Sequence, residues 1–277
     1  MTDSSWNSVI VERIGAVAQV TLVGPGKNNA MGPDFWREMP LVFETLDEDP
    51  SVRAVVVTGS GRNFSYGLDL AAMGGTFAPL MNGEDDNLAA PRAVLHEEIK
   101  QMQKALNAVA DCRKPVIAAI QGRCLGGGVD LIAACDIRYA SEDASFSIRE
   151  VKVAIVADMG SLQRLPAIIG DGHLRELALT GRDIDAVRAE RIGLVNDVLP
   201  DAEGVLAAAH ATATEIAANP PLVVHGVKDV LGQERAGRVS AGLRYVAAWN
   251  AAFLASEDLT EAMTAVFAQR APEFHGR

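Results

Sequence analysis

The segment CLGGGVDLIAACD, residues Cys124–Asp136, joins a glycine block to an apolar run. The block is Gly126–Gly128, and the run that follows is broken by a single acid, Asp130. Because an ordered glycine loses more backbone entropy than any other residue, three in a row indicate a place that requires bare backbone. The preceding run, Val116–Ile120, has the composition of a buried strand. The pattern predicts a strand, a glycine turn and a helix whose first N–H groups are free.

Composition places the chain among globular proteins. It has 277 residues, of which 49% are apolar and 22% are charged. The net charge of −11 disfavours a nucleic-acid partner, because such a protein presents a basic face to phosphate. No apolar run reaches about 18 residues, so no membrane partner is expected. The N-terminal sequence MTDSSWNSVIVERIG has no basic flank before an apolar stretch, so no secretory signal is expected.

The motifs of several enzyme classes are absent from the sequence. Gly59 and Gly61 follow an apolar run, but the third glycine of a dinucleotide loop would fall on Phe64. There is no phosphate-binding P-loop and no serine in a nucleophile elbow. The five histidines and three cysteines lack metal-ligand spacing, so no metal site is expected.

Hydrophobic periodicity predicts alternating strands and helices over the first two-thirds of the chain. The expected strands are Val9–Ile14, Ala18–Val23, Arg53–Thr58, Val116–Ile120 and Ile137–Ala140, and the expected helices are Met31–Leu46, Ala93–Ala110 and Gly127–Cys135. A loop is expected over Gly74–Ala90. After about Asp201 only helices are expected, at Gly204–Ala218, Pro221–Gln233, Gly237–Ala255 and Leu259–Gln269. This change from alternating strands and helices to helices alone predicts an α/β core over residues 1–200 and an all-α region over residues 201–277.

A second glycine junction, NFSYGLDL at Asn63–Leu70, also follows a predicted strand. If its strand and Val116–Ile120 are neighbours, two backbone N–H groups from different loops converge on one point. Two such donors can hold an oxyanion, and the positive end of a helix dipole adds to the effect. The alternative is that the glycines only permit close packing of a helix on a strand.

Three acids follow the glycine block: Asp130 and Asp158 in apolar surroundings, and Glu150 after the segment SFSIR. Each has a structural alternative; Asp130 can pair with an arginine, and Glu150 lies between Arg149 and Lys152, which suits a surface salt bridge. Buried acids are costly, however, so three in one short stretch favour a function. Clustered carboxylates raise one another's pKa values and can move protons near neutral pH.

Three blocks of this sequence resemble the crotonase (enoyl-CoA hydratase/isomerase) superfamily: FSYGLDL, GRCLGGGVDLIAACDIRYASEDASF and SEDLTEAMTAVFAQRAPEFHGR. The resemblance implies a spiral of ββα units with a helical C-terminal region that trimerises. It implies an acyl-CoA thioester as the substrate, with coenzyme A a part of that substrate and no separate cofactor. It also implies that the N–H groups of Leu68 and Gly127 form the oxyanion hole. The backbone around Tyr66, where the family often has a small residue, is implied to meet the CoA adenine.

The acids resemble those of one subfamily. Hydratases resemble the pattern G-G-G-x-E with a second Glu 20 residues later; here Asp130 takes the first place, Glu150 the second, and Asp158 adds a third acid. This trio, with FWREM at Phe35–Met39, resembles Δ3,5-Δ2,4-dienoyl-CoA isomerases. Their reaction takes a proton from C2 and adds one to C6, which two carboxylates at different depths can do. We expect Glu150 to serve C2, Asp158 to serve C6 and Asp130 to position or tune them; the reverse order of the two is the alternative.

Other functions remain open at this point. An ordinary 2-enoyl-CoA hydratase would use Asp130 and Glu150 to orient water. A non-catalytic acyl-CoA-binding or RNA-binding homologue is a further alternative, which the acidic charge and the retained acids disfavour.

Two properties of the whole protein are also predicted. Met263, Val266 and Phe267 recur at helical spacing near the C-terminus, which favours burial against partner subunits in a homotrimer or a dimer of trimers. The chain ends in His275-Gly276-Arg277 and not in the peroxisomal S-K-L, which favours a cytoplasmic location.

Overall fold

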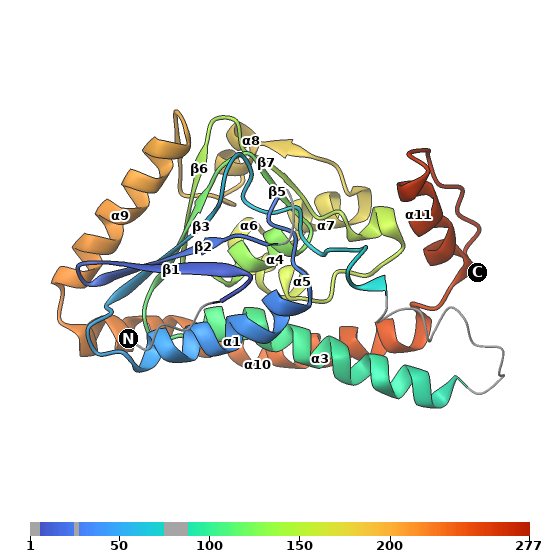
Figure 1. Cartoon of the computed structure of the whole chain (residues 1–277), viewed down its shortest axis with the longest axis horizontal. Helices are drawn as coiled ribbons and strands as arrows, with labels where there is room; N and C mark the ends of the chain where they lie inside the picture. Colours follow the sequence, from blue (N-terminus) through green and yellow to red (C-terminus); the bar gives the residue numbers. More distant parts are fainter. Residues whose placement is uncertain (1–5, 25–27, 75–87) are drawn as a thin grey trace.

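Within the residues that the structure describes, the larger of two sheets has six strands in the order β1-β2-β3-β4-β6-β9. Their bounds are Val9–Ile14, Val17–Leu22, Ala54–Gly59, Val116–Ile120, Ile137–Ser141 and Asp197–Leu199. Strands β1, β2, β3 and β6 of this sheet are labelled in Figure 1. Strands β1 and β2 form an antiparallel pair, and the other four pairs are parallel. Every residue of β3 and β4 is buried, which explains why both read as unbroken apolar runs. The computed structural model describes residues 6–24, 28–74 and 88–277.

A smaller sheet of three strands lies beside the larger one. It consists of β5 (Arg123–Leu125), β7 (Ser145–Ser147) and β8 (Ile184–Asp185) in that order. The chain passes from β4 into β5 and from β6 into β7, while the segment after β3 joins β5 through a bridge between Ser65 and Cys124. Each of these strands of the larger sheet is therefore followed by a short segment that pairs beside it, and helix α4 (Gly127–Ala134) continues the β4–β5 unit.

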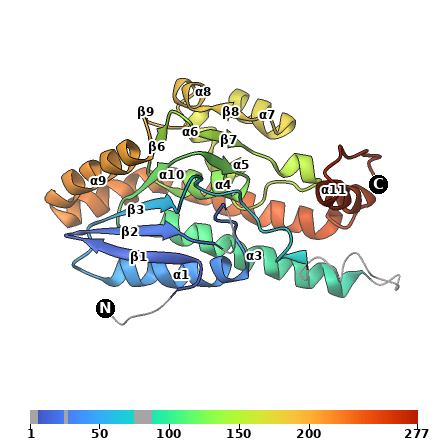
Figure 2. The same cartoon turned by 45° about the horizontal axis from the view of Figure 1, so that its top comes forward.

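Helices cover both faces of the larger sheet. Helices α1 (Pro33–Glu48) and α3 (Ala89–Asp111) pack together on one face (Figure 2), and their apolar residues share a core with Val55, Val57 and Ala118. The other face packs against α9 (Ala202–Ala218), through Val205, Ala209 and Ala213. In the described part of the chain, no helix has the length and hydropathy needed to cross a membrane.

The C-terminal helices pack against elements from the middle of the chain. Helix α10 (Pro221–Phe253) packs against α3 and against the short helix α5 (Ser161–Arg164). Helix α11 (Glu257–Phe267) contacts the 3₁₀ turn η1 (Glu150–Val153). Between these regions lie α6 (Pro166–Ile169), α7 (Asp171–Thr180) and α8 (Ala186–Arg191).

Most predicted elements are confirmed within a few residues, and the clearest difference is in the C-terminal helices. The helices predicted at Pro221–Gln233 and Gly237–Ala255 are one helix of 33 residues. Gly232 and Gly237 permit this because both lie in open space, where a glycine weakens a helix by only about 1 kcal/mol. Most of the loop predicted over Gly74–Ala90 lies outside the described residues, and α3 already begins at Ala89.

All three cysteines are buried. Cys112 follows the last residue of α3, Cys124 lies in β5 and Cys135 follows α4. Burial raises the pKa of Cys112 to about 11 and that of Cys135 to about 12, and it raises the pKa of Cys124 as well.

Candidate active site

The two glycine junctions lie side by side, as the sequence predicts. Strands β3 and β4 are parallel neighbours, so the loops at their carboxyl ends leave the sheet together. The Leu125 N–H donates to the Ser65 carbonyl over 2.9 Å, and the Ser65 N–H donates to the Arg123 carbonyl over 3.0 Å. These bonds fix the segment after β3 against β5.

Two backbone N–H groups meet where these loops touch. A Cβ atom placed on Gly127 would lie 3.7 Å from the Leu68 nitrogen, and one on Gly67 would lie 2.7 Å from the Gly127 nitrogen. Gly127 is the first residue of α4, so its N–H has no partner within the helix. Among the described residues, neither the Leu68 nor the Gly127 N–H has a hydrogen-bond acceptor. The pair can therefore donate to one external oxygen atom.

The three adjacent glycines have different reasons to be glycine. Gly126 has a φ of 52°, which side chains rarely adopt. A Cβ atom on Gly128 would lie 3.1 Å from the Ser65 carbonyl oxygen, so this glycine allows close packing. A Cβ atom on Gly127 would lie 3.0 Å from the Met31 sulfur, beside the N–H pair. The packing alternative thus holds for Gly128, while Gly127 keeps the N–H pair accessible.

Asp130 lies one turn into α4 and is 1% exposed. Its Oδ1 accepts a hydrogen bond of 2.5 Å from the N–H of Ser161, the first residue of α5. Its Oδ2 is buried and has no hydrogen-bond partner among the described residues. Burial raises the pKa of Asp130, although the Ser161 N–H and the charge of Arg164 oppose the rise. The Arg164 guanidinium itself donates to Asn107 and to the Met159 carbonyl, so the expected arginine partner acts on Asp130 only through its charge.

Glu150 begins the turn η1, and its carboxyl group faces the glycine block. A Cβ atom on Gly126 would lie 3.4 Å from Glu150 Oε1, while Oε2 is buried without a hydrogen-bond partner among the described residues. Burial raises the pKa of Glu150 well above its ordinary value, and the charges of Asp130 and Asp158 raise it further. The surface salt-bridge alternative is wrong here because Arg149 instead pairs with Asp183 over 2.5 Å.

Asp158 lies in an irregular segment between η1 and α5. Its Oδ2 accepts a hydrogen bond of 2.7 Å from the side-chain amide of Asn250 in α10. Its main-chain carbonyl accepts one of 2.8 Å from the amide of Gln103 in α3. Burial raises the pKa of Asp158 to about 7; the Asn250 hydrogen bond opposes this rise and the charge of Asp130 adds to it. The three predicted acids therefore share one electrostatic environment.

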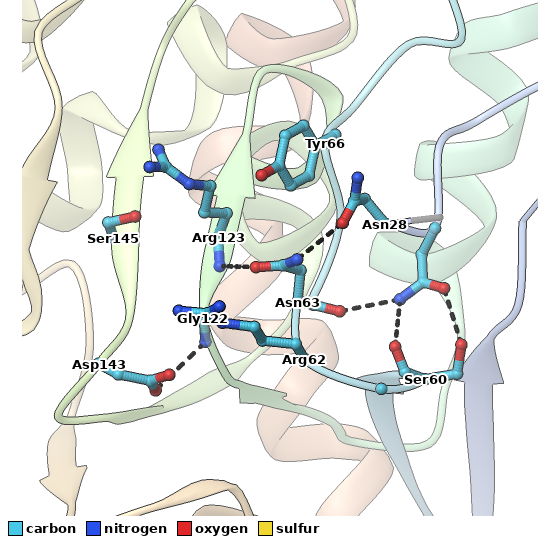
Figure 3. Close-up of a pocket in the computed structure, with 11 residues that line it drawn as sticks. Asn28, Ser60, Arg62, Asn63, Tyr66, Gly122, Arg123, Asp143 and Ser145 are labelled. Atoms are coloured by element: carbon cyan, nitrogen blue, oxygen red, sulfur yellow. Dashed lines mark hydrogen bonds between the residues drawn. The ribbon is translucent and has the colours of Figure 1, made fainter. Parts of the chain in front are cut away.

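A polar pocket of about 680 Å³ lies at the residues of the two loops that precede Leu68 and Gly127 (Figure 3). Tyr66, which is 41% exposed, lines it together with Arg62 and Arg123. Asn63 connects the two loops, because its Oδ1 accepts a hydrogen bond of 3.0 Å from the Arg123 N–H. Its amide also donates to Asn28 Oδ1, in the segment between β2 and α1, over 2.8 Å. The pocket contains none of the three acids. It can hold a polar, anionic group while the N–H pair and the acids act elsewhere.

Sequence reasoning missed several residues of this region. Arg62 and Asn63 follow the predicted strand in the motif GRNF, so their position after a buried strand was an available signal. Gln103 and Asn250 had no such signal, because each lies within a long helix far along the chain from Asp158.

Named relatives were found by sequence comparison. The chain is 43% identical to a peroxisomal Δ3,5-Δ2,4-dienoyl-CoA isomerase of Arabidopsis thaliana, over 99% of this chain and 94% of the relative. It is 44% identical to a mitochondrial one of Dictyostelium discoideum, over 93% of this chain and 87% of the relative. These organelle proteins contradict the predicted cytoplasmic location. That prediction was wrong because receptors read addresses of several kinds, so one missing tripeptide does not indicate a compartment.

Comparisons with solved structures and with family models point to the same group of proteins as the sequence relatives do. An enoyl-CoA hydratase/isomerase from Pseudoalteromonas atlantica has a TM-score of 0.83 to this structure at 26% identity, over 97% of this chain and all of that one. The predicted crotonase-like fold, a mixed α/β core with a helical C-terminal region, is thereby confirmed. The family model described as enoyl-CoA hydratase/isomerase matches residues 12–277. This chain belongs to the enoyl-CoA hydratase/isomerase family.

Proposed function

We propose that the protein is a Δ3,5-Δ2,4-dienoyl-CoA isomerase. The observation that carries the proposal is the gathering of three interacting carboxyl groups, the buried Asp130 and the half-buried Glu150 and Asp158, beside a pair of free backbone N–H groups. The relatives that carry this name match nearly the whole chain, which supports the same activity here. The substrate is an acyl-CoA thioester, and coenzyme A enters as a part of it.

The N–H groups of Leu68 and Gly127 bind the thioester oxygen. When a proton leaves C2, negative charge develops on this oxygen, and two fixed donors stabilise it without reorganising. Gly127 also begins α4, so the positive end of the helix dipole favours the same charge. The absence of a side chain on Gly127 leaves room for the thioester.

Glu150 takes the C2 proton, and Asp158 supplies the C6 proton. The C2–H bond breaks, the double bonds at C3 and C5 become double bonds at C2 and C4, and a C6–H bond forms. Glu150 is assigned to C2 because its Oε1 lies beside Gly126, next to the oxyanion donors. A general base must first be within reach of the proton that it takes, and its pKa is considered second. The Asn250 hydrogen bond favours an ionised Asp158 and so supports the reverse order. A proton-exchange measurement, given in the Discussion, decides between the two orders.

Asp130 adds to the effect of burial in raising the pKa values of the other two acids. Its Oδ1 is held by the Ser161 N–H, while its charge raises the pKa values of Glu150 and Asp158. Neighbouring buried carboxyls resist ionising together, so the two reacting acids share a proton. One of them is then ready to accept a proton while the other is ready to donate.

The polar pocket at Tyr66 holds the nucleotide end of coenzyme A. Both loops that carry the oxyanion donors also line this pocket, so a thioester at Leu68 and Gly127 extends toward it. Arg62 and Arg123 outweigh the one acid of its lining, Asp143, and give the pocket a net positive charge for phosphate groups. The ring of Tyr66 provides a surface for the adenine.

The subunits associate as a homotrimer or a dimer of trimers. Helix α10 exposes apolar side chains, among them Leu222, which is 85% exposed, and Val230. Nearer its end, Tyr245, Trp249 and Phe253 form an exposed row of neighbouring rings. Exposed apolar patches of this kind mark association surfaces.

The C-terminal region, residues 201–277, supplies this surface, and residues 1–200 supply the acids and the oxyanion donors. Met263, one of the residues expected at the interface, instead packs against the core of its own chain, while Val266 is exposed.

A spectroscopic assay tests the proposed function. Purified protein is mixed with a 3,5-dienoyl-CoA, and the conjugated 2,4-dienoyl thioester is followed by its absorbance. A parallel assay follows the loss of the conjugated absorbance of a 2-enoyl-CoA. Isomerisation with slow hydration is expected. Fast hydration without isomerisation would establish the hydratase alternative, and binding of acyl-CoA without turnover would establish a non-catalytic homologue.

A further inference from the structure

The segment that carries Asp158 has no regular secondary structure of its own. It runs from Ala154 to Gly160, between η1 and α5. Side chains from two helices hold it from outside. Gln103 of α3 donates to the Asp158 carbonyl over 2.8 Å and to the Leu243 carbonyl over 3.2 Å. Asn250 of α10 makes the other contacts, so the position of this acid depends on helices that are distant in sequence.

Asn250 uses both hydrogens of its amide on this segment. One bond of 2.8 Å goes to the Val156 carbonyl, and one of 2.7 Å goes to Asp158 Oδ2. Both partners are acceptors, and an amide nitrogen supplies the two donors that they require. Asn250 is only 2% exposed, and Val246, Ala247 and Ala251 are its buried neighbours on α10. A polar residue on this apolar helix face is costly unless it has partners.

We propose that Asn250 is a positioning residue for the reaction: it aims the Asp158 carboxyl group and favours its ionised form, so that this group readily releases its proton to C6 or, in the reverse order, is ionised when it takes the proton from C2. The inference rests on the proposed isomerase function. Among the described residues, the Asn250 amide is the one side chain that donates a hydrogen bond to this carboxylate. A donor to a carboxylate makes a charge-assisted bond, which is stronger than a bond between neutral groups.

The charged groups around Asp158 make such a donor necessary. Asp130 from α4 and Glu150 from η1 both disfavour a further negative charge. Arg164 from α5 acts on Asp130, and neither Asp130 nor Glu150 donates to Asp158 in the structure. Burial and Asp130 raise the pKa of Asp158 to about 7, against the effect of Asn250. Without Asn250, the carboxyl group would hold its proton to a higher pH.

The test is the pH dependence of kcat/KM for 3,5-dienoyl-CoA isomerisation, which reports groups in the free enzyme. Asn250→Ala removes the donor, and Asn250→Asp replaces it by an acceptor of the same shape. The limb of the profile that belongs to Asp158 should move to higher pH by about one unit in Asn250→Ala and by more in Asn250→Asp. It is the alkaline limb if Asp158 is the C6 acid and the acid limb if it is the C2 base. The shift is upward in both cases.

Gln103→Met is the matched control. It removes a hydrogen bond from the same segment but leaves the Asp158 carboxylate and its donor intact. Its profile should keep the parental midpoint even if its rate falls. Thermal unfolding identifies folded variants, and Asn250→Asp keeps the test available if Asn250→Ala does not fold.

The outcomes separate two possible failures. If the parent protein does not isomerise 3,5-dienoyl-CoA, the proposed function is wrong. If the parent does so and folded Asn250 variants keep its pH midpoint, as Gln103→Met does, then Asn250 only supports the segment and the inference is overturned.

Discussion

Replacing Asp158 by Asn separates the isomerase from the hydratase reading. The substitution keeps the size of the side chain and removes its ability to move a proton. A general acid or base contributes about 10²–10⁴-fold to a rate, so isomerisation should fall by that factor. Glu150 and the N–H groups of Leu68 and Gly127 stay in place. The variant should therefore still exchange the C2 proton of the substrate with deuterated solvent, whereas Glu150→Gln should not.

The same substitution has a consequence for stability that follows from the pKa. Asp158 titrates at about 7 in the folded protein, against an ordinary value of 3.8 that applies to the unfolded chain. Because the folded pKa is the higher one, the folded state loses stability as the pH rises from about 4 to about 7. At about 1.4 kcal/mol for each pKa unit, the whole loss is about 4 kcal/mol. About 3 kcal/mol of it falls between pH 5 and pH 8. The side-chain amide in the Asp158→Asn variant does not titrate, so the stability of the variant avoids this loss.

Two measurements check the reasoning. Proton exchange and isomerisation are followed by NMR and absorbance on the same samples. Denaturant unfolding of parent and variant is then compared at pH 5 and pH 8, at one fixed subunit concentration. The variant should gain stability relative to the parent by about 3 kcal/mol over this range. Parental isomerisation by Asp158→Asn would refute the three-acid mechanism. Exchange that is lost in Asp158→Asn but kept in Glu150→Gln would show that the two acids act in the reverse order. A stability difference that does not change with pH would show that Asp158 is not the titrating group.

Three further substitutions test other parts of the site. Gly127→Val places a side chain against Met31 and beside the Leu68 nitrogen, and turnover should fall about 10²–10³-fold as one oxyanion donor is lost; a folded variant with normal kcat would make Gly127 a packing residue only. Arg62→Ala should raise KM for a dienoyl-CoA but not for the matching pantetheine thioester; equal effects on both would move the nucleotide away from the polar pocket. Trp249→Ser should weaken subunit association in sedimentation at micromolar concentration, where the parent should be a trimer or hexamer; a monomeric parent would remove the assembly proposal.

Local patterns in the sequence were sufficient to predict the parts of the fold that depend on them. The buried strands β3 and β4 are continuous apolar runs, and their parallel pairing brings the two glycine junctions together. The short strands β5 and β7 were missed because three residues carry no periodic signal. The single helix α10 was divided in the prediction because its glycines resemble an end, whereas in open space they are tolerated.

The residues of the site likewise divide into those that the local sequence could predict and those that it could not. Asp130 and Asp158 could be found because they interrupt apolar sequence, which is unusual for charged residues. Glu150 was nevertheless ambiguous, because only the structure shows that Arg149 is already paired with Asp183. The partner of Asp158 could not be found, because Asn250 comes from a helix 92 residues later. Nothing in the local sequence YVAAWNAAF distinguishes this residue from any polar residue on a helix.

The three buried cysteines can be used to measure local opening of the structure. Thiol reagents attack the thiolate, so a shielded cysteine with a raised pKa is labelled only when the structure around it opens. Cys124 lies in β5, against the segment after β3, and its labelling measures how often the two loops of the oxyanion hole separate. Cys112 at the end of α3 measures opening elsewhere in the same molecule. Comparing the two labelling rates with and without an acyl-CoA would show which of the two regions opens less often when the substrate is bound.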